Sequence, residues 1–152
     1  MLPDATVLNR ILSGAGVTVR FDETTLGVVA YVPCEMAVEA LSALRGSDLD
    51  FHMLLDMLGA DTGEGIEITY HLRSLSRDED LFVKTEVSYD GTLRSVWNLF
   101  PSALAPERET AELLGIKLEG HPNPKRLLTT DGVEPLLRKS VALRSVEEVR
   151  AR

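Results

Sequence analysis

Two neighbouring segments alternate between apolar and polar residues, and they constrain the fold more than any other feature of the chain. A period of two is typical of a β-strand that buries one face. Residues 66–73, IEITYHLR, and residues 81–89, LFVKTEVSY, both keep this period. The sequence therefore predicts two adjacent antiparallel strands. Their inward-facing positions are Ile66, Ile68, Tyr70, Leu72, Leu81, Val83, Thr85 and Val87.

The residues before these strands predict a helix, two strands, a second helix and a third strand. Apolar residues at helical spacing after Asp4 indicate a helix that ends at Gly14, and residues 34–45 indicate another that ends at Gly46. The predicted strands are VTVRF at 17–21, LGVVAYV at 26–32 and a buried FHMLLDML at 51–58. The predicted turns are DETT at 22–25, DTGEG at 61–65 and DED at 78–80. The last three strands are expected to form an antiparallel meander.

After Gly91 the apolar period becomes helical. Leu93, Val96, Trp97 and Phe100 predict a helical turn with Thr92 as its N-cap. A further helix is expected from about Ser102 to Leu114, followed by a coil-rich tail. We therefore predict an α+β fold in two layers with a mixed or antiparallel sheet. Residues 1–115 are expected to form the α+β domain, and residues 116–152 an extended docking tail of the same domain.

Cysteine and histidine usage limits the chemistry. Cys34 is the single cysteine, so no intramolecular disulfide and no multi-cysteine zinc or iron–sulfur site is expected. The three histidines fall in different predicted elements. We expect no catalytic residue and no metal site. The competing hypothesis is a small free-standing enzyme that uses Cys34 or His121.

Charge and hydropathy indicate a cytoplasmic chain that does not bind nucleic acid. No apolar run approaches the roughly 20 residues of a membrane helix, and the amino terminus lacks the pattern of a secretory signal. The net charge is −8. Residues 1–106 carry 7 Lys/Arg against 16 Asp/Glu, and residues 107–152 carry 9 against 8. Nucleic-acid binding needs a clearly basic face and is therefore disfavoured, which leaves a protein partner for the last third open.

Residues 107–128, ERETAELLGIKLEGHPNPKRLL, have the features of a protein interface. The prolines hold the backbone extended, and Leu118, Leu127 and Leu128 offer apolar anchors beside a Lys-Arg pair. His121 is expected to make a hydrogen bond that fixes the loop. The sequence therefore predicts a docking surface here.

The same residues resemble a known family. ERE, Glu112-Leu113-Leu114, His121, Lys125 and Leu127-Leu128 are similar to the signature of the thirty-kilodalton subunit of respiratory complex I. In quinone-linked bacterial enzymes this is the C subunit of NADH-quinone oxidoreductase. The stretches FHMLLDMLGAD, ITYHLRSLS and SVWNLFPSALAPERE also resemble the family, so the likeness covers about residues 38–128.

The resemblance implies a non-catalytic, cofactor-free subunit in the peripheral arm of a membrane-attached, ion-translocating oxidoreductase. It implies a place on the cytoplasmic face of the cell membrane and support of electron transfer to quinone, with iron–sulfur clusters in partner subunits. The implied partners are a large quinone-site or hydrogenase-like subunit and neighbouring iron–sulfur subunits, with the membrane arm contacted indirectly. The implied interface residues are Glu107, Arg108, Glu109, His121, Lys125 and Arg126, with Leu118 and Leu127 as apolar anchors.

Departures from the family pattern keep other interpretations open. Pro106 stands where the family commonly has an aromatic residue, and EPLLRKSVALRS keeps only Leu137, Arg138 and Lys139 of a longer segment that is usual in the quinone-type members. One alternative is the equivalent subunit of a membrane-bound nickel–iron hydrogenase or a deazaflavin-coenzyme dehydrogenase. An alternative of another class is a self-associating α+β binding module.

Overall fold

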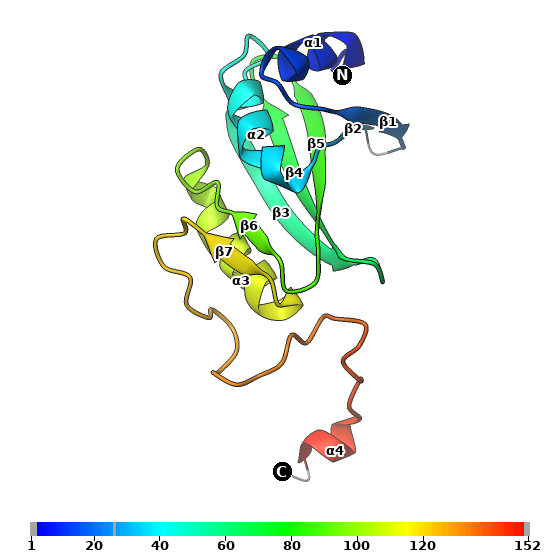
Figure 1. Ribbon diagram of the computed structural model, residues 1–152, viewed down its shortest axis with the longest axis vertical. Helices are drawn as coiled ribbons and strands as arrows, with labels where there is room; N and C mark the ends of the chain where they lie inside the picture. The colour runs from blue at the N-terminus through cyan, green and yellow to red at the C-terminus, as the bar shows by residue number, and fades with distance from the viewer. Residues whose placement is uncertain (1–2, 26, 151–152) are drawn as a thin grey trace.

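The chain folds around a mixed five-stranded sheet. The computed structural model describes residues 3–25 and 27–150. The strand order is β1-β2-β5-β4-β3, and β2 pairs with β5 in parallel while the other neighbours are antiparallel. The strands span Arg20–Thr24 (β1), Gly27–Tyr31 (β2), Met53–Asp61 (β3), Ile66–Ser74 (β4) and Glu79–Val87 (β5). The predicted α+β class and the antiparallel meander of the last three strands are confirmed (Figure 1).

One face of this sheet and two helices enclose the core. All eight inward-facing positions predicted in β4 and β5 are buried, because their period matches the pleat. Helix α1, Ala5–Gly14, buries Leu8 and Leu12 and is N-capped by the Asp4 carboxylate. A single 3-10 turn, η1 (Cys34–Met36), leads into α2, Ala37–Arg45, which buries the four apolar residues at helical spacing, Ala37, Ala40, Leu41 and Leu44.

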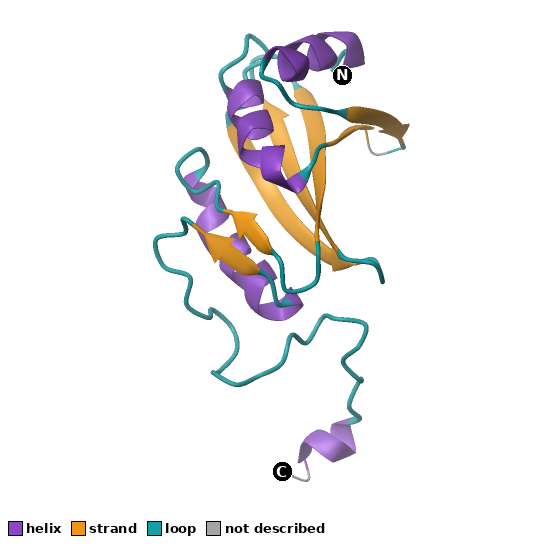
Figure 2. Cartoon of the chain, viewed as in Figure 1, coloured by secondary structure: helices purple, strands orange, loops and turns teal. Residues whose placement is uncertain are grey.

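A second unit packs beside β3. It comprises β6 (Thr92–Arg94), the 3-10 turn η2 (Pro101–Ala103), α3 (Leu104–Leu114) and β7 (Lys117–Glu119), and β6 pairs with β7 in parallel. Helix α3 lies so close to β3 that a Cβ added at Gly59 would collide with the side chains of Leu114 and Thr110. Gly115 ends α3 in the left-handed conformation, with φ of 72°. Figure 2 shows this helix and the two short strands below α1 and α2, and their buried residues Leu93 and Leu114 join the same core.

The carboxy-terminal tail is largely irregular. Residues 120–145, all of which the structure describes, contain no helix or strand, and a short helix, α4, spans Val146–Arg150. Figure 2 shows the tail leaving β7 and extending away from the sheet. Within the described ranges, no helix is long and apolar enough to cross a membrane. The division at residue 115 stays a prediction.

Two sequence predictions gave the wrong type of element or the wrong burial, one for residues 92–100 and one for residues 51–58. The helical turn does not span residues 92–100, because residues 92–94 instead pair with β7. Residues 96–100 alone form a turn, closed by the hydrogen bond from the Phe100 N–H to the Val96 carbonyl at 2.8 Å. Leu93, Val96 and Phe100 are buried as the periodicity required, but Trp97 is 37% exposed. The 51–58 segment is not a buried strand: β3 is an edge strand that leaves Met53, Leu55 and Leu58 exposed.

Two predicted turns are strand instead. The first strand begins at Arg20 rather than Val17 and runs through most of DETT, since Thr24 pairs with Gly27. Glu79 and Asp80 of DED begin β5, where Glu79 is buried and Asp80 forms an ion pair with Arg73. Both segments are polar, and polar residues are typical of turns, so the sequence did not predict strands here. Charged residues are nevertheless tolerated in a strand at the edge of a sheet or where they form ion pairs. The DTGEG hairpin turn is confirmed by the hydrogen bond from Thr62 N–H to Gly65 O.

Candidate docking surface

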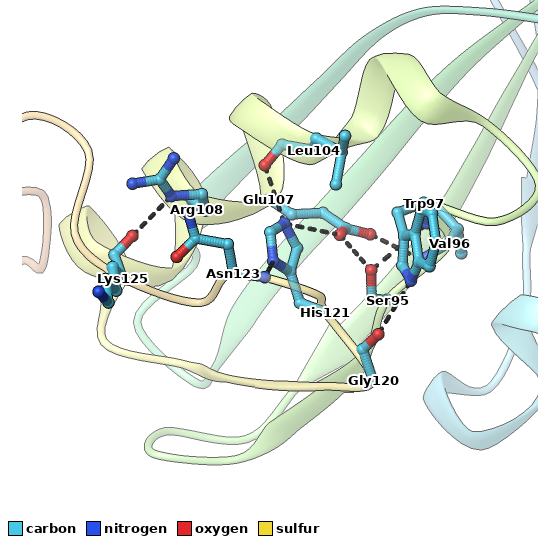
Figure 3. Close-up of polar contacts among 10 residues, drawn as sticks. All are labelled: Ser95, Val96, Trp97, Leu104, Glu107, Arg108, Gly120, His121, Asn123 and Lys125. Carbon is cyan, nitrogen blue, oxygen red and sulfur yellow. Dashed lines mark hydrogen bonds and ion pairs between the residues drawn. The ribbon is translucent and has the colours of Figure 1, made fainter.

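Glu107 ties the start of α3 to the segment between β6 and η2. Its side chain is fully buried, and its carboxylate accepts hydrogen bonds from the Val96 N–H at 2.7 Å and from the Ser95 hydroxyl (Figure 3). Burial raises the pKa of this carboxyl above its usual range, while the two hydrogen bonds oppose the rise. Glu107 therefore acts inside the chain and does not present its side chain to a partner.

His121 fixes the loop that follows β7. Its Nε2 lies 2.9 Å from the Leu104 carbonyl, and its Nδ1 accepts the Asn123 N–H at 3.0 Å. These partners place the proton on Nε2, which donates to Leu104. The Glu107 carboxylate lies 3.8 Å from the same nitrogen, and His121 is buried (Figure 3). The predicted loop-fixing hydrogen bond is confirmed, and the side chain is not on the surface.

Arg108 holds the tail against α3. Its Nε donates to the Lys125 carbonyl at 2.6 Å, and its Nη2 donates to the Arg126 carbonyl at 2.8 Å. Arg126 in turn donates to Thr129 Oγ1 at 2.6 Å and to the Val133 carbonyl at 2.7 Å, which shapes the next turn of the tail. The guanidinium of Arg108 is thus occupied within the chain.

Glu112 lies one turn after Arg108 on the same face of α3 and completes the attachment of the tail. Its two carboxylate oxygens accept the N–H groups of Leu127 at 2.7 Å and Leu128 at 2.6 Å. Desolvation works to raise the pKa of this carboxyl, but these N–H groups and the charge of Arg126 outweigh it and lower the pKa. The four-residue spacing of Arg108 and Glu112 is the signal that predicts a shared role. The site prediction did not include Glu112.

Arg138 fastens a later part of the tail to the end of α3. Its Nε donates to the Leu114 carbonyl at 2.6 Å, and its Nη2 donates to the Gly115 carbonyl at 2.9 Å and to Asp90 at 2.9 Å. A cation here also meets the negative end of the helix dipole. The neighbouring Leu137 N–H donates to the Leu113 carbonyl at 2.9 Å. No local sequence signal links residues 24 positions apart, and the site prediction did not include Arg138.

The attached tail leaves its apolar side chains on the surface. Leu127, Leu128, Leu136 and Leu137 are 41%, 62%, 47% and 57% exposed. Of the predicted interface residues, Glu109, Lys125 and Leu127 are exposed, Arg108 and Arg126 are half-buried, and Leu118 packs partly against the core. We call these four exposed side chains of the tail, Leu127, Leu128, Leu136 and Leu137, the leucine patch. They are candidate docking residues because exposed apolar side chains on an ordered segment can mark interaction sites.

Cys34, the residue of the alternative enzyme hypothesis, lies at the start of η1. It is half-buried, and burial together with the Glu35 charge raises the pKa of its thiol. Within the described residues, no group of three or more histidine, cysteine or acidic side chains is placed to hold a metal ion.

Comparison with known proteins identifies the class. The family described as "Respiratory-chain NADH dehydrogenase, 30 Kd subunit" matches residues 30–147. The NADH-quinone oxidoreductase C subunit of Methylobacterium sp. is 38% identical over 150 residues, covering 94% of this chain and 68% of that one. The corresponding protein of Caulobacter sp. is 36% identical over 123 residues, covering 78% of this chain and 58% of that one. The chain therefore belongs to this thirty-kilodalton subunit family, as the resemblance implied.

Two further likenesses extend the comparison. The NADH-quinone oxidoreductase C/D subunit of Yersinia pestis is 32% identical over 131 residues, covering 78% of this chain and 22% of that one. A chain in the structure of the membrane-bound sulfane sulfur reductase, an archaeal respiratory membrane complex, has a TM-score of 0.75 and 22% identity. The match covers 96% of this chain and 88% of that one. This likeness shows the fold.

Proposed function

We propose that the chain is a docking subunit in the peripheral arm of a complex-I-type, ion-translocating oxidoreductase. It would serve electron transfer to quinone by holding neighbouring subunits in place, on the cytoplasmic face of the membrane. In this proposal the chain carries no redox cofactor and no catalytic residue, and the iron–sulfur clusters belong to its partners. Family membership supports the assembly, and the leucine patch supports the docking role.

The proposal rests on the hydrogen bonds by which residues of α3 and Arg138 hold the tail against the end of that helix. Arg108, Glu112 and Arg138 hold backbone groups of the tail, and this leaves the leucine side chains facing outward. A patch of ordered leucines can bury against a partner at a low cost in conformational entropy. The signature residues thus act as internal supports, and the leucines with Lys125 and Glu109 form the contact surface.

We propose the large quinone-site subunit as the partner of the leucine patch. The name of the Yersinia pestis relative, C/D, joins the letters of two subunits, and the match to this chain takes up 22% of that relative. Segments that are fused in one protein and separate in another commonly contact each other. The neighbouring iron–sulfur subunits are the remaining proposed partners, and the membrane arm is contacted through them.

The experiment is purification of the complex from the host through a tag on this chain, with each copurifying protein identified. We expect the large quinone-site subunit, iron–sulfur subunits and membrane subunits. Leu128→Asp places a charge on the exposed patch and should reduce their recovery while the chain still folds. Leu75→Asp, at a 68% exposed leucine outside the patch, is the matched control. Recovery of the chain alone as a defined oligomer would overturn the proposal.

A second candidate is the equivalent subunit of a membrane-bound nickel–iron hydrogenase or deazaflavin-coenzyme dehydrogenase. The departures from the family pattern at Pro106 and around Leu137, Arg138 and Lys139 favour it. The same purification separates the two, because a nickel–iron-type subunit would copurify in place of the NADH-oxidising subunits.

A further inference from the structure

The outer edge of β3 has no neighbouring strand among the described residues. β3 is nine residues long and carries the exposed side chains of Met53, Leu55 and Leu58. The opposite edge strand, β1, is shorter and carries exposed Arg20, Asp22 and Glu23. Charged, short edges resist pairing with other chains, whereas long apolar edges invite it. The two edges of this sheet therefore differ in their capacity to accept another strand.

A groove of about 350 Å³ runs along the β3 edge. Residues 56–59 of β3 form one wall. The other wall is one face of α3, since the lining positions 106, 109, 110, 113 and 114 follow the helical repeat. Leu137 of the tail also lines the groove. An edge strand facing a helix across a groove is the arrangement in which an extended peptide can add a strand.

The groove has an apolar floor and an acidic rim. Met57 and Leu114 are buried at its base, and Leu113 lines its α3 side. The Leu58 side chain lies on the opposite face of the sheet, because its partner in β4 is Thr69. The rim carries Asp56 and Glu109, both exposed, and no lysine or arginine of the described chain lines the groove. A segment that combines aliphatic side chains with basic ones would match both the floor and the rim.

The backbone of β3 also leaves hydrogen-bonding capacity on this edge. The Leu54 carbonyl accepts the Ser102 hydroxyl at 3.1 Å, and the Met57 N–H donates to the Asp56 carboxylate at 2.8 Å. Beyond these two contacts β3 forms its ladder with β4 alone in the described part of the chain. In an antiparallel edge strand, alternate N–H and C=O groups point outward. An added strand would pair with such groups near residues 58–60.

We propose that the β3 edge and its groove accept an extended segment of a neighbouring subunit in which aliphatic residues alternate with lysine or arginine. The segment pairs with β3, its aliphatic side chains enter the groove beside α3, and its cations lie on the opposite face of the sheet, beside Asp56. The inference rests on the proposed function for the source of the segment, and its surface adjoins the leucine patch, because Leu137 belongs to both. A second copy of this chain fits poorly, because its own β3 would bring Asp56 to the same acidic rim.

Hydrogen–deuterium exchange on the full chain, alone and in the purified complex, tests the inference. We expect the outward-pointing amides within residues 56–60 to exchange at least about tenfold more slowly in the complex. Asp56→Lys reverses the charge beside which the cations of the segment lie and should abolish this protection, while Leu75→Lys, at an exposed turn outside the groove, should keep it. Both side chains are exposed, so neither substitution should unfold the chain.

Three results would overturn the inference, and they differ in what they say of the proposed function. If the complex forms and the tail over 125–137 gains protection while 56–60 does not, the edge is unoccupied and the docking role stands. If protection of 56–60 appears in the chain alone as a dimer forms, the occupant is a second copy. If no complex can be purified, the proposed function fails and this inference fails with it.

Discussion

The carboxylate of Glu112 accepts the backbone N–H of Leu127 at 2.7 Å, although the residues lie 15 positions apart in the sequence. Its second oxygen accepts the next N–H in the same way. A helix thereby supplies hydrogen-bond acceptors to a segment that has no sheet or helix of its own. The tail is ordered at this point because its backbone donors are satisfied by a charged side chain.

Replacement of Glu112 by alanine should release this part of the tail. Two hydrogen bonds from backbone groups to a carboxylate are lost, and each is worth about 1.5–3 kcal/mol in favourable cases. We expect the amides of Leu127 and Leu128 to exchange faster, with little change in the exchange of β4. Glu109→Ala, which removes an exposed carboxylate three positions earlier, is the control. Equal exchange rates in the two variants would show that Glu112 does not hold the tail.

Arg138→Ala should destabilise the end of α3. The substitution removes donors from the Leu114 and Gly115 carbonyls and a favourable charge at the helix carboxy terminus, which together amount to about 2 kcal/mol. Urea unfolding followed by the fluorescence of Trp97, the single tryptophan, measures the change. Lys139→Ala is the matched control, since Lys139 contacts Asp61 through its backbone N–H, which alanine retains. The prediction fails if both variants unfold at the same urea concentration.

Gly59→Val should separate α3 from β3. A Cβ at this position meets Thr110 Cγ2 at 2.7 Å and lies closer still to Leu114, so the helix must shift or the chain must strain. Overpacking of this kind costs about 1–3 kcal/mol. Thermal unfolding should show a lower midpoint. In contrast, Gly14→Ala has open space around it and a backbone that alanine tolerates, so it should leave the midpoint unchanged or raise it.

The strands and the core could be predicted wherever a strand or helix buries one face and exposes the other. β4 and β5 alternate because they lie in the middle of the sheet, and α2 keeps a buried stripe because it packs on one face. β3 was misjudged because an edge strand carries apolar residues on a side that no described strand covers. Residues 92–100 were misjudged because their apolar spacing suits a helix, while β6 instead pairs with a strand that follows α3.

The sequence could single out a region but not its contacts. It predicts a docking surface at residues 107–128, which stays a prediction, and the exposed leucines at 127 and 128 lie within this range. Sequence alone could not separate outward side chains from inward ones at Glu107 and His121, whose burial depends on β6 and α3. Nor could it join Arg138 to Gly115, because that hydrogen bond depends on the path of an irregular tail.

Glu107 predicts a dependence of stability on pH. Burial raises its pKa in the folded chain above the value of about 4.3 for an exposed glutamate. At a pH between the two pKa values, the folded state therefore holds a proton that the unfolded state has released. The stabilisation from protonated Glu107 is complete below the ordinary pKa and is lost as pH rises through the folded one.

Urea unfolding of wild type and of Glu107→Gln at a series of pH values measures this effect, because glutamine is nearly the same shape and does not titrate. We expect the free energy of unfolding of wild type, relative to the variant, to decrease as pH rises from about 4 to about 8. The Glu112→Gln comparison should slope the other way, since the pKa of Glu112 is lowered and its contribution is lost as pH falls. Slopes of the same sign would mean that Glu107 is solvated, and that α3 is not fixed to residues 95 and 96 through a buried carboxyl.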